Sequence, residues 1–355
     1  MITIRKQLGE LNIDEATAAG LPEDSLLFDI ETTGLSPYES GLYLIGVLFL
    51  NGNGWETVQW FAESFSEEQA VLRAFLEFSE PFGTLVSFNG DGFDLRFLEE
   101  CANEYRIPFR LKEKSSIDLH KIARKLKHVT GLTSCRQKDV EEYLGVFRPD
   151  PFSGAELIRV YERYVDSKSQ KDLDALLLHN ENDVEGLTKL LPLLPMLRFL
   201  EAPVLERVDQ SETSDGRIVF TAALPVRFPK PIQRTFPCGN ALSIRENRLA
   251  LSVPVFSGPM KLFFPDWRNY SFLPNEGIAV HNKLAAFVDS SRKTPATRET
   301  AYSLLSSEFV PASGKEVEVP LYRREYADPE RFIRLRDLVP ERYATGMLSS
   351  LLTAK

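Results

Sequence analysis

The order of short apolar segments between residues 25 and 191 constrains the fold of this chain more than any other feature. Three strand-like segments come first, SLLFDIE, LYLIGVLFL and ETVQWFA, and the NGNGW between the last two predicts a tight hairpin. Two further short strands, GTLVSFNG and SSIDLH, alternate with segments of helical periodicity. Hairpin-connected strands followed by strands that alternate with helices predict an α/β domain on a mixed sheet flanked by helices.

The helical spacing of apolar residues and the positions of N-cap residues predict where the helices lie. They cover SEEQAVLRAFLEFSE, with Ser66 as the N-cap, then FDLRFLEECANEY, and then about residues 136–144, 154–165 and 168–190. The prolines of LPLLPMLRFLEAP, at positions 192, 195 and 203, interrupt this pattern and mark a domain boundary.

Beyond the boundary the sequence predicts a different order of strands and helices. RVDQSETSDGRIVFTAAL and ALSIRENRLALSVPVF resemble hairpins, and MKLFFP a further strand, while IAVHNKLAAFVD, TRETAYSLLSSE and DPERFIRLRDLV have helical spacing. The expected organisation is an N-terminal extension over 1–24, an α/β domain over 25–195 and a smaller β-rich α+β domain over 203–355, whose role the sequence does not indicate.

Composition narrows the class of protein. No apolar run reaches the ~20 residues of a transmembrane helix, and charges in MITIRKQLGELNIDE stand where a signal peptide would be apolar. The cysteines Cys101, Cys135 and Cys238 are odd in number and far apart, which favours free thiols in a reducing cytoplasm over a disulfide framework or a zinc ribbon. A cytoplasmic protein without a membrane partner is therefore expected.

Two carboxylates interrupt the first strand of the α/β region. Side chains alternate along a strand, so Asp29 and Glu31 point to one face while Phe28 and Ile30 anchor the other. Adjacent, partly buried carboxylates repel each other, and a divalent cation relieves that repulsion. Hard cations such as Mg²⁺ and Mn²⁺ prefer these oxygen ligands. The pair alone is weak evidence, because Asp-x-Glu occurs by chance in most long chains.

Two later clusters have the same chemistry. In SFNGDGFD a strand ends at Asn89, and Asp94 follows near the first turn of the next helix, where it is either a metal ligand or a cap. In LLLHNENDVEGL, His179 and Asp183 are four residues apart and share one face of a helix. Neither cluster is convincing by itself.

Taken in order, FDIETTG, NGDGFD and HNEND resemble the three motifs of the DEDD superfamily of 3′–5′ exonucleases, which have an RNase H-like fold. With IDLHKIARKL and DPFSGAELIRVYERY, the similarity is to the RNase H-like exonuclease domain of the YprB type, over about residues 25–191. The resemblance implies that Asp29, Glu31, Asp94 and Asp183 hold two metal ions. His179 would be the general base, although it has the histidine of one subgroup at the spacing of another subgroup's tyrosine.

The expected activity is hydrolysis of the terminal phosphodiester of single-stranded nucleic acid with two Mg²⁺ or Mn²⁺ ions ~3.5–4 Å apart. Thr32, Thr33, Gly34 and Leu35 follow the first acidic pair and would bind the last nucleotide, with Leu35 packing on a base, while Asn89 and Phe93 would shape the floor of the site. Two alternatives stay open: a metal-dependent endonuclease or resolvase on the same fold, and a non-catalytic nucleic-acid-binding module. RNA and DNA are equally compatible with the motifs.

A basic stretch on an otherwise acidic chain suggests a path for the strand. The formal net charge is -9, yet residues 106–138 carry Arg106, Arg110, Lys112, Lys114, Lys121, Arg124, Lys125, Lys127, Arg136 and Lys138. Such a stripe either follows a phosphate backbone or is a solvated helix face.

Overall fold

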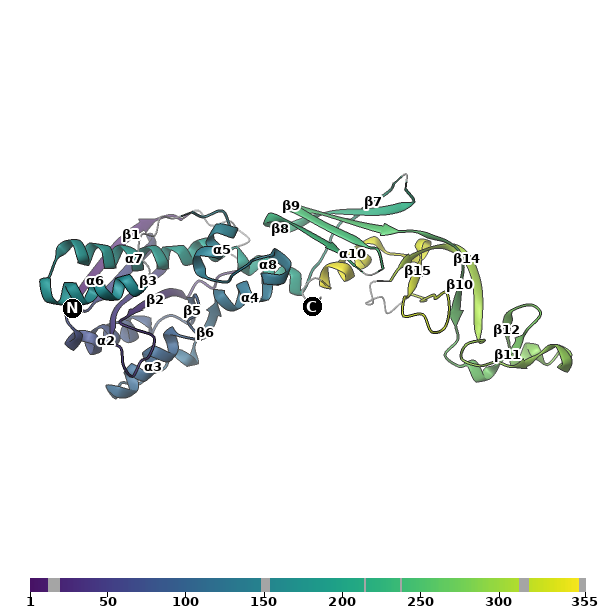
Figure 1. Cartoon of the computed structure of the whole chain (residues 1–355), viewed down its shortest axis with the longest axis horizontal. Coiled ribbons are helices and arrows are strands. Elements are labelled where there is room, and N and C mark those ends of the chain that lie inside the picture. The colour runs from purple at the N-terminus through teal and green to yellow at the C-terminus, as the bar shows by residue number, and fades with distance from the viewer. Residues whose placement is uncertain (12–19, 148–153, 214, 237, 313–318, 351–355) are drawn as a thin grey trace. The chain divides into compact units, whose positions relative to one another are not determined.

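A computed structural model describes residues 1–11, 20–147, 154–213, 215–236, 238–312 and 319–350 (Figure 1). Residues 150–153 of the segment DPFSGAELIRVYERY therefore lie outside the described residues. The chain forms two compact units, Met1–Arg198 and Phe199–Lys355, and the boundary falls within helix α8 (Leu193–Glu201). The prolines at 192 and 195 stand at the start of this helix, where a missing backbone N–H interrupts no intrahelical hydrogen bond.

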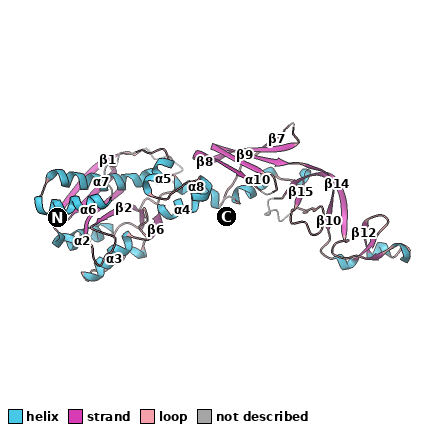
Figure 2. Cartoon of the chain, in the orientation of Figure 1, coloured by secondary structure: helices cyan, strands magenta, loops and turns pink. Residues whose placement is uncertain are grey.

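The first unit is built on a six-stranded mixed sheet in the order β1-β4-β3-β2-β5-β6. Figure 2 shows strands of this unit in magenta among its helices in cyan. Neighbours among β1, β4, β3 and β2 are antiparallel, whereas β5 is parallel to β2 and β6 is parallel to β5. The predicted mixed sheet is thus confirmed. The strands after β1 are β2 (Ser25–Thr32), β3 (Leu42–Asn51), β4 (Gly54–Phe61), β5 (Thr84–Ser87) and β6 (Ser115–Asp118).

The first residues of the chain belong to this sheet. β1 (Ile2–Gly9) pairs antiparallel with β4 and forms one edge. Ile2 and Ile4 are half-buried and alternate with exposed Thr3 and Arg5, which is the pattern of an edge strand with one covered face. The first unit therefore begins at Met1 rather than at residue 25, and residues 2–9 are not a separate extension.

Helices cover both faces of the sheet. On one face, Phe75 of α2 packs against Phe28 of β2 and Trp60 of β4, with ring centroids 5.6 and 6.3 Å apart. On the other face lies α7, which contacts β2, β3 and β4. The helices are α2 (Glu68–Ser79), α3 (Asp94–Glu104), α4 (Leu119–Thr130), α5 (Gln137–Tyr143), α6 (Gly154–Ser167) and α7 (Gln170–Leu190). A 3₁₀ turn over Phe65–Glu67 precedes α2, so Glu67 is its N-cap and not Ser66.

The second unit is rich in short sheets, as predicted. The first sheet consists of β7 (Asp209–Glu212), β8 (Arg217–Thr235) and β9 (Ala241–Pro254). The second consists of β10 (Phe256–Phe263), β14 (Tyr302–Pro311) and β15 (Phe332–Arg334). The third consists of β11 (Tyr270–Leu273), β12 (Ile278–His281) and β13 (Thr294–Pro295). The helices with α-helical geometry described here are α9 (Asn282–Ala285) and α10 (Pro340–Ser349).

Several local predictions for this unit are wrong. ALSIRENRLALSVPVF is not a hairpin, because β9 runs through Arg245 and Arg248 as one strand with a kink at Glu246, whose φ is +54°. The helical spacing of TRETAYSLLSSE belongs to strand β14, and FIR of DPERFIRLRDLV forms β15. Both segments pair with distant strands, and such pairing overrides local periodicity. Within the described part of the chain, no helix is long and apolar enough to cross a membrane.

Candidate metal centre

Strand β2 carries the first two carboxylates to the face of the sheet under α7. Phe28 and Ile30 are buried on the opposite face, at 1% and 6% exposure, so strand alternation places Asp29 and Glu31 as the sequence predicts. The register of β2 against β3 shifts directly after Glu31. The strand therefore holds both carboxylates on a rigid element and ends just beyond them.

The loop after β5 delivers the third carboxylate. Asn89 has a left-handed backbone, with φ +68°, and its carbonyl accepts hydrogen bonds from the amides of Gly92 and Phe93, both at 3.0 Å. Asp94 is the first residue of α3 and is 5% exposed. Asp118 fixes this loop, because its Oδ1 accepts the Asn89 amide at 2.9 Å while also capping α4.

Helix α7 contributes a histidine and the fourth carboxylate. His179 Nε2 lies 3.1 Å from Asp183 Oδ2 and 3.6 Å from Glu31 Oε1. Ligand atoms of Glu31, His179 and Asp183 all lie within 4.8 Å of one another. One turn of α7 and the end of β2, about 150 residues apart in the sequence, thus meet at one point.

The carboxyl groups of Asp29 and Asp94 both have raised pKa values. Burial raises the pKa of Asp29 well above its usual range, and the charges of Glu31, Asp183 and Asp94 raise it further. Burial also raises the pKa of Asp94 to about 7. Hydrogen bonds from the backbone of Asp94 and Ile30 act to lower this pKa, and the charge of Asp118 acts to raise it. Four acids therefore share a region in which their ionised forms repel.

This donor set fits a hard divalent cation. Carboxylate oxygens are the ligands that Mg²⁺ and Mn²⁺ prefer, and a cation would offset the cost of burying the ionised Asp29 and Asp94 carboxylates as well as the repulsion from neighbouring acids. An imidazole is a borderline ligand for Mn²⁺ and a poor one for Mg²⁺. The four acids are therefore the candidate ligands, and His179 stands beside them.

Close approach of α7 to the sheet depends on a glycine that sequence analysis missed. A Cβ at Gly46 would lie 2.0 Å from Asn180 Oδ1 and 3.0 Å from Val184 Cγ2. Gly46 pairs with Asp29 across the sheet, so its missing side chain makes room for α7 over the first carboxylate. Only the register of two strands reveals this role, and no local pattern around Gly46 signals it.

Other supporting residues also escaped prediction. Asn180, which is fully buried, donates from Nδ2 to Asp29 Oδ2 at 3.1 Å, and Gln59 donates to Asn180 Oδ1 at 2.9 Å. Tyr43 is buried beside Glu31, and burial together with the charges of Glu31 and Asp29 raises the pKa of its phenol. The one feature of the sequence that could have pointed to Asn180 is its position next to His179.

The predicted nucleotide-binding residues follow β2 and β5. Thr33 closes the loop after β2, because its amide donates to the Gly41 carbonyl at 2.9 Å and its Oγ1 accepts the Gly41 amide at 2.8 Å. Thr32 Oγ1 donates to the Gly34 carbonyl at 2.7 Å, and Leu35 is 85% exposed. Of the other two predicted residues, Asn89 is exposed, while Phe93 packs on the hydrophobic core of the unit.

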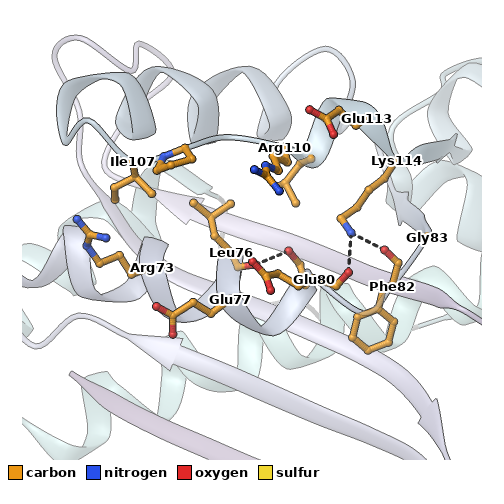
Figure 3. Close-up of a pocket in the computed structure, with 13 residues that line it drawn as sticks. Arg73, Leu76, Glu77, Glu80, Phe82, Gly83, Ile107, Arg110, Glu113 and Lys114 are labelled. Atoms are coloured by element: carbon orange, nitrogen blue, oxygen red, sulfur yellow. Dashed lines mark hydrogen bonds between the residues drawn. The ribbon is translucent and has the colours of Figure 1, made fainter.

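A separate cleft of about 640 Å³ lies between the C-terminal half of α2 and the segment that follows α3 (Figure 3). Its lining includes Gly83 and Lys114, which precede β5 and β6, whereas Asp94 and Asp118 come at the other ends of these strands. Lys114 Nζ donates to the Glu80 carbonyl at 3.2 Å. None of the four clustered acids lines this cleft, so it is distinct from the candidate metal centre.

The chain was compared with curated proteins, solved structures and protein families. No curated protein matches the chain. Among solved structures, the family B DNA polymerase from the hyperthermophilic archaeon Pyrobaculum calidifontis matches with 17% sequence identity and a TM-score of 0.40, over 68% of this chain and 34% of the polymerase. The match thus spans about a third of the length of that polymerase. Residues 26–194 match a family model of the RNase_H superfamily, and the six-stranded mixed sheet flanked by helices is consistent with an RNase H-like α/β fold of the first unit.

Proposed function

We propose that this protein is a divalent-metal-dependent 3′–5′ exonuclease of the DEDD type that hydrolyses single-stranded nucleic acid. The observation that carries the proposal is the convergence of Glu31, His179 and Asp183 within 4.8 Å, with Asp29 and Asp94 close enough to repel. The RNase_H superfamily match over residues 26–194 supports the nuclease class. The ordered motifs of the sequence support the 3′–5′ direction.

In this proposal the four acids hold two Mg²⁺ or Mn²⁺ ions. When bound, such ions supply an activated water and neutralise charge on the leaving oxygen. Asp29 and Glu31 present their carboxylates from a rigid strand, and Asp183 presents its carboxylate from α7. Asp94 stands at the start of α3, where the helix dipole favours its ionised form.

His179 is the candidate general base. Its Nε2 points toward Asp183 Oδ2 and Glu31 Oε1, at 3.1 and 3.6 Å, and its side chain is 13% exposed. An imidazole titrates near neutrality, so it can take the proton that the attacking water loses. The carboxylates beside it stabilise the imidazolium that forms. The one-residue difference in spacing from the histidine subgroup therefore does not keep the imidazole away from the acids.

The loop after β2 is suited to the end of a strand. Thr33 and Gly41 close the loop by two hydrogen bonds, and the side chain of Leu35 stands exposed within it. An exposed leucine next to a nuclease centre can pack on the face of the terminal base. The approach to the site would follow the exposed cationic face of α4, which includes Arg124 and Lys127.

The experiment uses 5′-labelled single-stranded RNA and DNA, each with Mn²⁺, with Mg²⁺ and with EDTA. The expected product is a ladder that shortens from the 3′ end, requires the metal and is absent from Asp29→Ala and Asp183→Ala. Asp91→Ala is the matched control, because Asp91 lies three residues before Asp94 but binds Ser116 and Lys121 instead of the cluster. Internal cuts would indicate an endonuclease instead, and full-length substrate under every condition would indicate a binding module.

A further inference from the structure

Three residues in register lie in a row across the sheet beneath α7. Asp29 of β2 pairs with Gly46 of β3, and Gly46 pairs with Gln59 of β4. The side chain of Asn180 lies over the glycine in the middle of the row, since a Cβ at Gly46 would reach its Oδ1. From there Asn180 contacts both ends of the row, with Nδ2 on Asp29 and Oδ1 on Gln59.

The partners of Gln59 fix the orientation of both amides. Gln59 Nε2 donates to the carbonyl of Leu177 at 2.9 Å, and a backbone carbonyl can only accept. The same Nε2 donates its second proton to Asn180 Oδ1, also at 2.9 Å. Asn180 must therefore turn its Nδ2 toward Asp29, where it donates to Oδ2 at 3.1 Å and reaches the Asp29 carbonyl at 3.5 Å.

We propose that Asn180 is a positioning residue that holds the Asp29 carboxylate in the orientation that binds a divalent cation, and that Gln59 acts on the metal through Asn180. The inference rests on the proposed metal-dependent function. It assigns roles to a residue of α7 and a residue of β4 that are not among the candidate metal ligands.

Burial keeps the hydrogen bond from Asn180 to Asp29 in one fixed geometry. Asn180 is 0% exposed and Gln59 is 5% exposed, so water does not replace either partner. The bond engages Oδ2 of Asp29, and in this proposal Oδ1 is the atom that binds the cation. Groups that hydrogen-bond to a metal-ligating carboxylate fix its rotamer, and their loss typically lowers metal affinity by about 10- to 100-fold.

The experiment measures Mn²⁺ binding to the full chain by calorimetry, which needs no substrate. Asn180→Ala is expected to weaken binding by about 10- to 100-fold, and Gln59→Met, which keeps the volume and removes the donor, by a smaller factor. Gln59→Met is expected to have no further effect in the Asn180→Ala background, because the donor then has nothing to orient. Thr188→Val is the control, since Thr188 is 4% exposed on the same helix and its hydroxyl donates to the Glu185 carbonyl at 2.7 Å, away from Asn180 and Gln59.

Circular dichroism at the binding temperature selects variants that are folded. The proposal is overturned if folded Asn180→Ala binds Mn²⁺ within twofold of the wild type, or if Gln59→Met weakens binding equally in both backgrounds. Should Asn180→Ala not fold, the comparison of Gln59→Met with Thr188→Val decides, and equal affinities overturn the proposal.

The two proposals fail in different ways. Mn²⁺ binding that depends on Asn180, without cleavage of any substrate, contradicts only the nuclease function. Cleavage that requires Asp29 but proceeds with unchanged Mn²⁺ affinity in Asn180→Ala contradicts only the positioning role.

Discussion

Replacing Asp94 with Asn is predicted to stabilise the metal-free protein in alkaline solution. The carboxyl of Asp94 is 5% exposed, and burial raises its pKa from 3.8 to about 7. For an acid whose pKa is higher in the folded state, the cost of folding is absent below the unfolded pKa and complete above the folded one. At about 1.4 kcal/mol per pKa unit, this cost is about 4 kcal/mol at pH 8 and about 2 kcal/mol at pH 5.

Asp94→Asn removes this cost, so its gain in the free energy of unfolding should be largest at pH 8 and should shrink at pH 5. The assay is urea unfolding in EDTA at both pH values, followed by tryptophan fluorescence, since Trp55 and Trp60 are buried in the first unit. Adding Mn²⁺ should stabilise the wild type more than the variant, because a bound cation favours the ionised Asp94 carboxylate, which the variant lacks.

Asp91→Asn is the matched control with the opposite sign. Desolvation acts to raise the pKa of Asp91, but hydrogen bonds from Lys121 and Ser116 outweigh it and lower that pKa. Asp91→Asn should therefore not stabilise the protein at pH 8. The reasoning would be refuted if Asp94→Asn were less stable than the wild type at pH 8 in EDTA, or equally stabilising at pH 5.

Three other perturbations test separate parts of the site. Gly46→Ala should lower the free energy of unfolding by about 1–3 kcal/mol, because the new Cβ meets Asn180; a urea titration that shows no loss would contradict the spacing argument. His179→Ala should reduce turnover by about 10²- to 10⁴-fold while Mn²⁺ affinity changes little, and unchanged turnover in the gel assay would remove it from the mechanism. Changing Arg124 and Lys127 to Gln should weaken the salt dependence of single-strand binding, measured by fluorescence anisotropy. The slope of log binding constant against log salt concentration should fall by ~0.7 per lost phosphate contact, and an unchanged slope would mean that α4 is only a solvated face.

The fold of the first unit is largely legible in the sequence because its signals are local. Apolar alternation around Asp29 and Glu31 specifies which face of β2 is buried, and NGNGW specifies the turn between β3 and β4. The second unit is harder to predict, because β14 and β15 are set by pairing with distant strands. The segment 302–311 carries apolar residues at a spacing that fits a helix, yet its register against β10 decides the structure.

The acids of the candidate site could be found because they carry the chemistry and occur in a recognisable order. Their supports could not be found in the same way. Gly46 and Gln59 matter only because strand register aligns them with Asp29, and Asn180 matters because α7 crosses that row. These contacts join residues far apart in the sequence, so no short-range pattern of residues predicts them.

The division of the acids between β2, α3 and α7 has a consequence for biosynthesis. A nascent chain that has emerged only through α6 already carries Asp29, Glu31 and Asp94, but it lacks His179 and Asp183. No complete set of ligands exists until α7 emerges and docks. Under the proposed activity, an unfinished chain therefore cannot cut the nucleic acids that surround a ribosome.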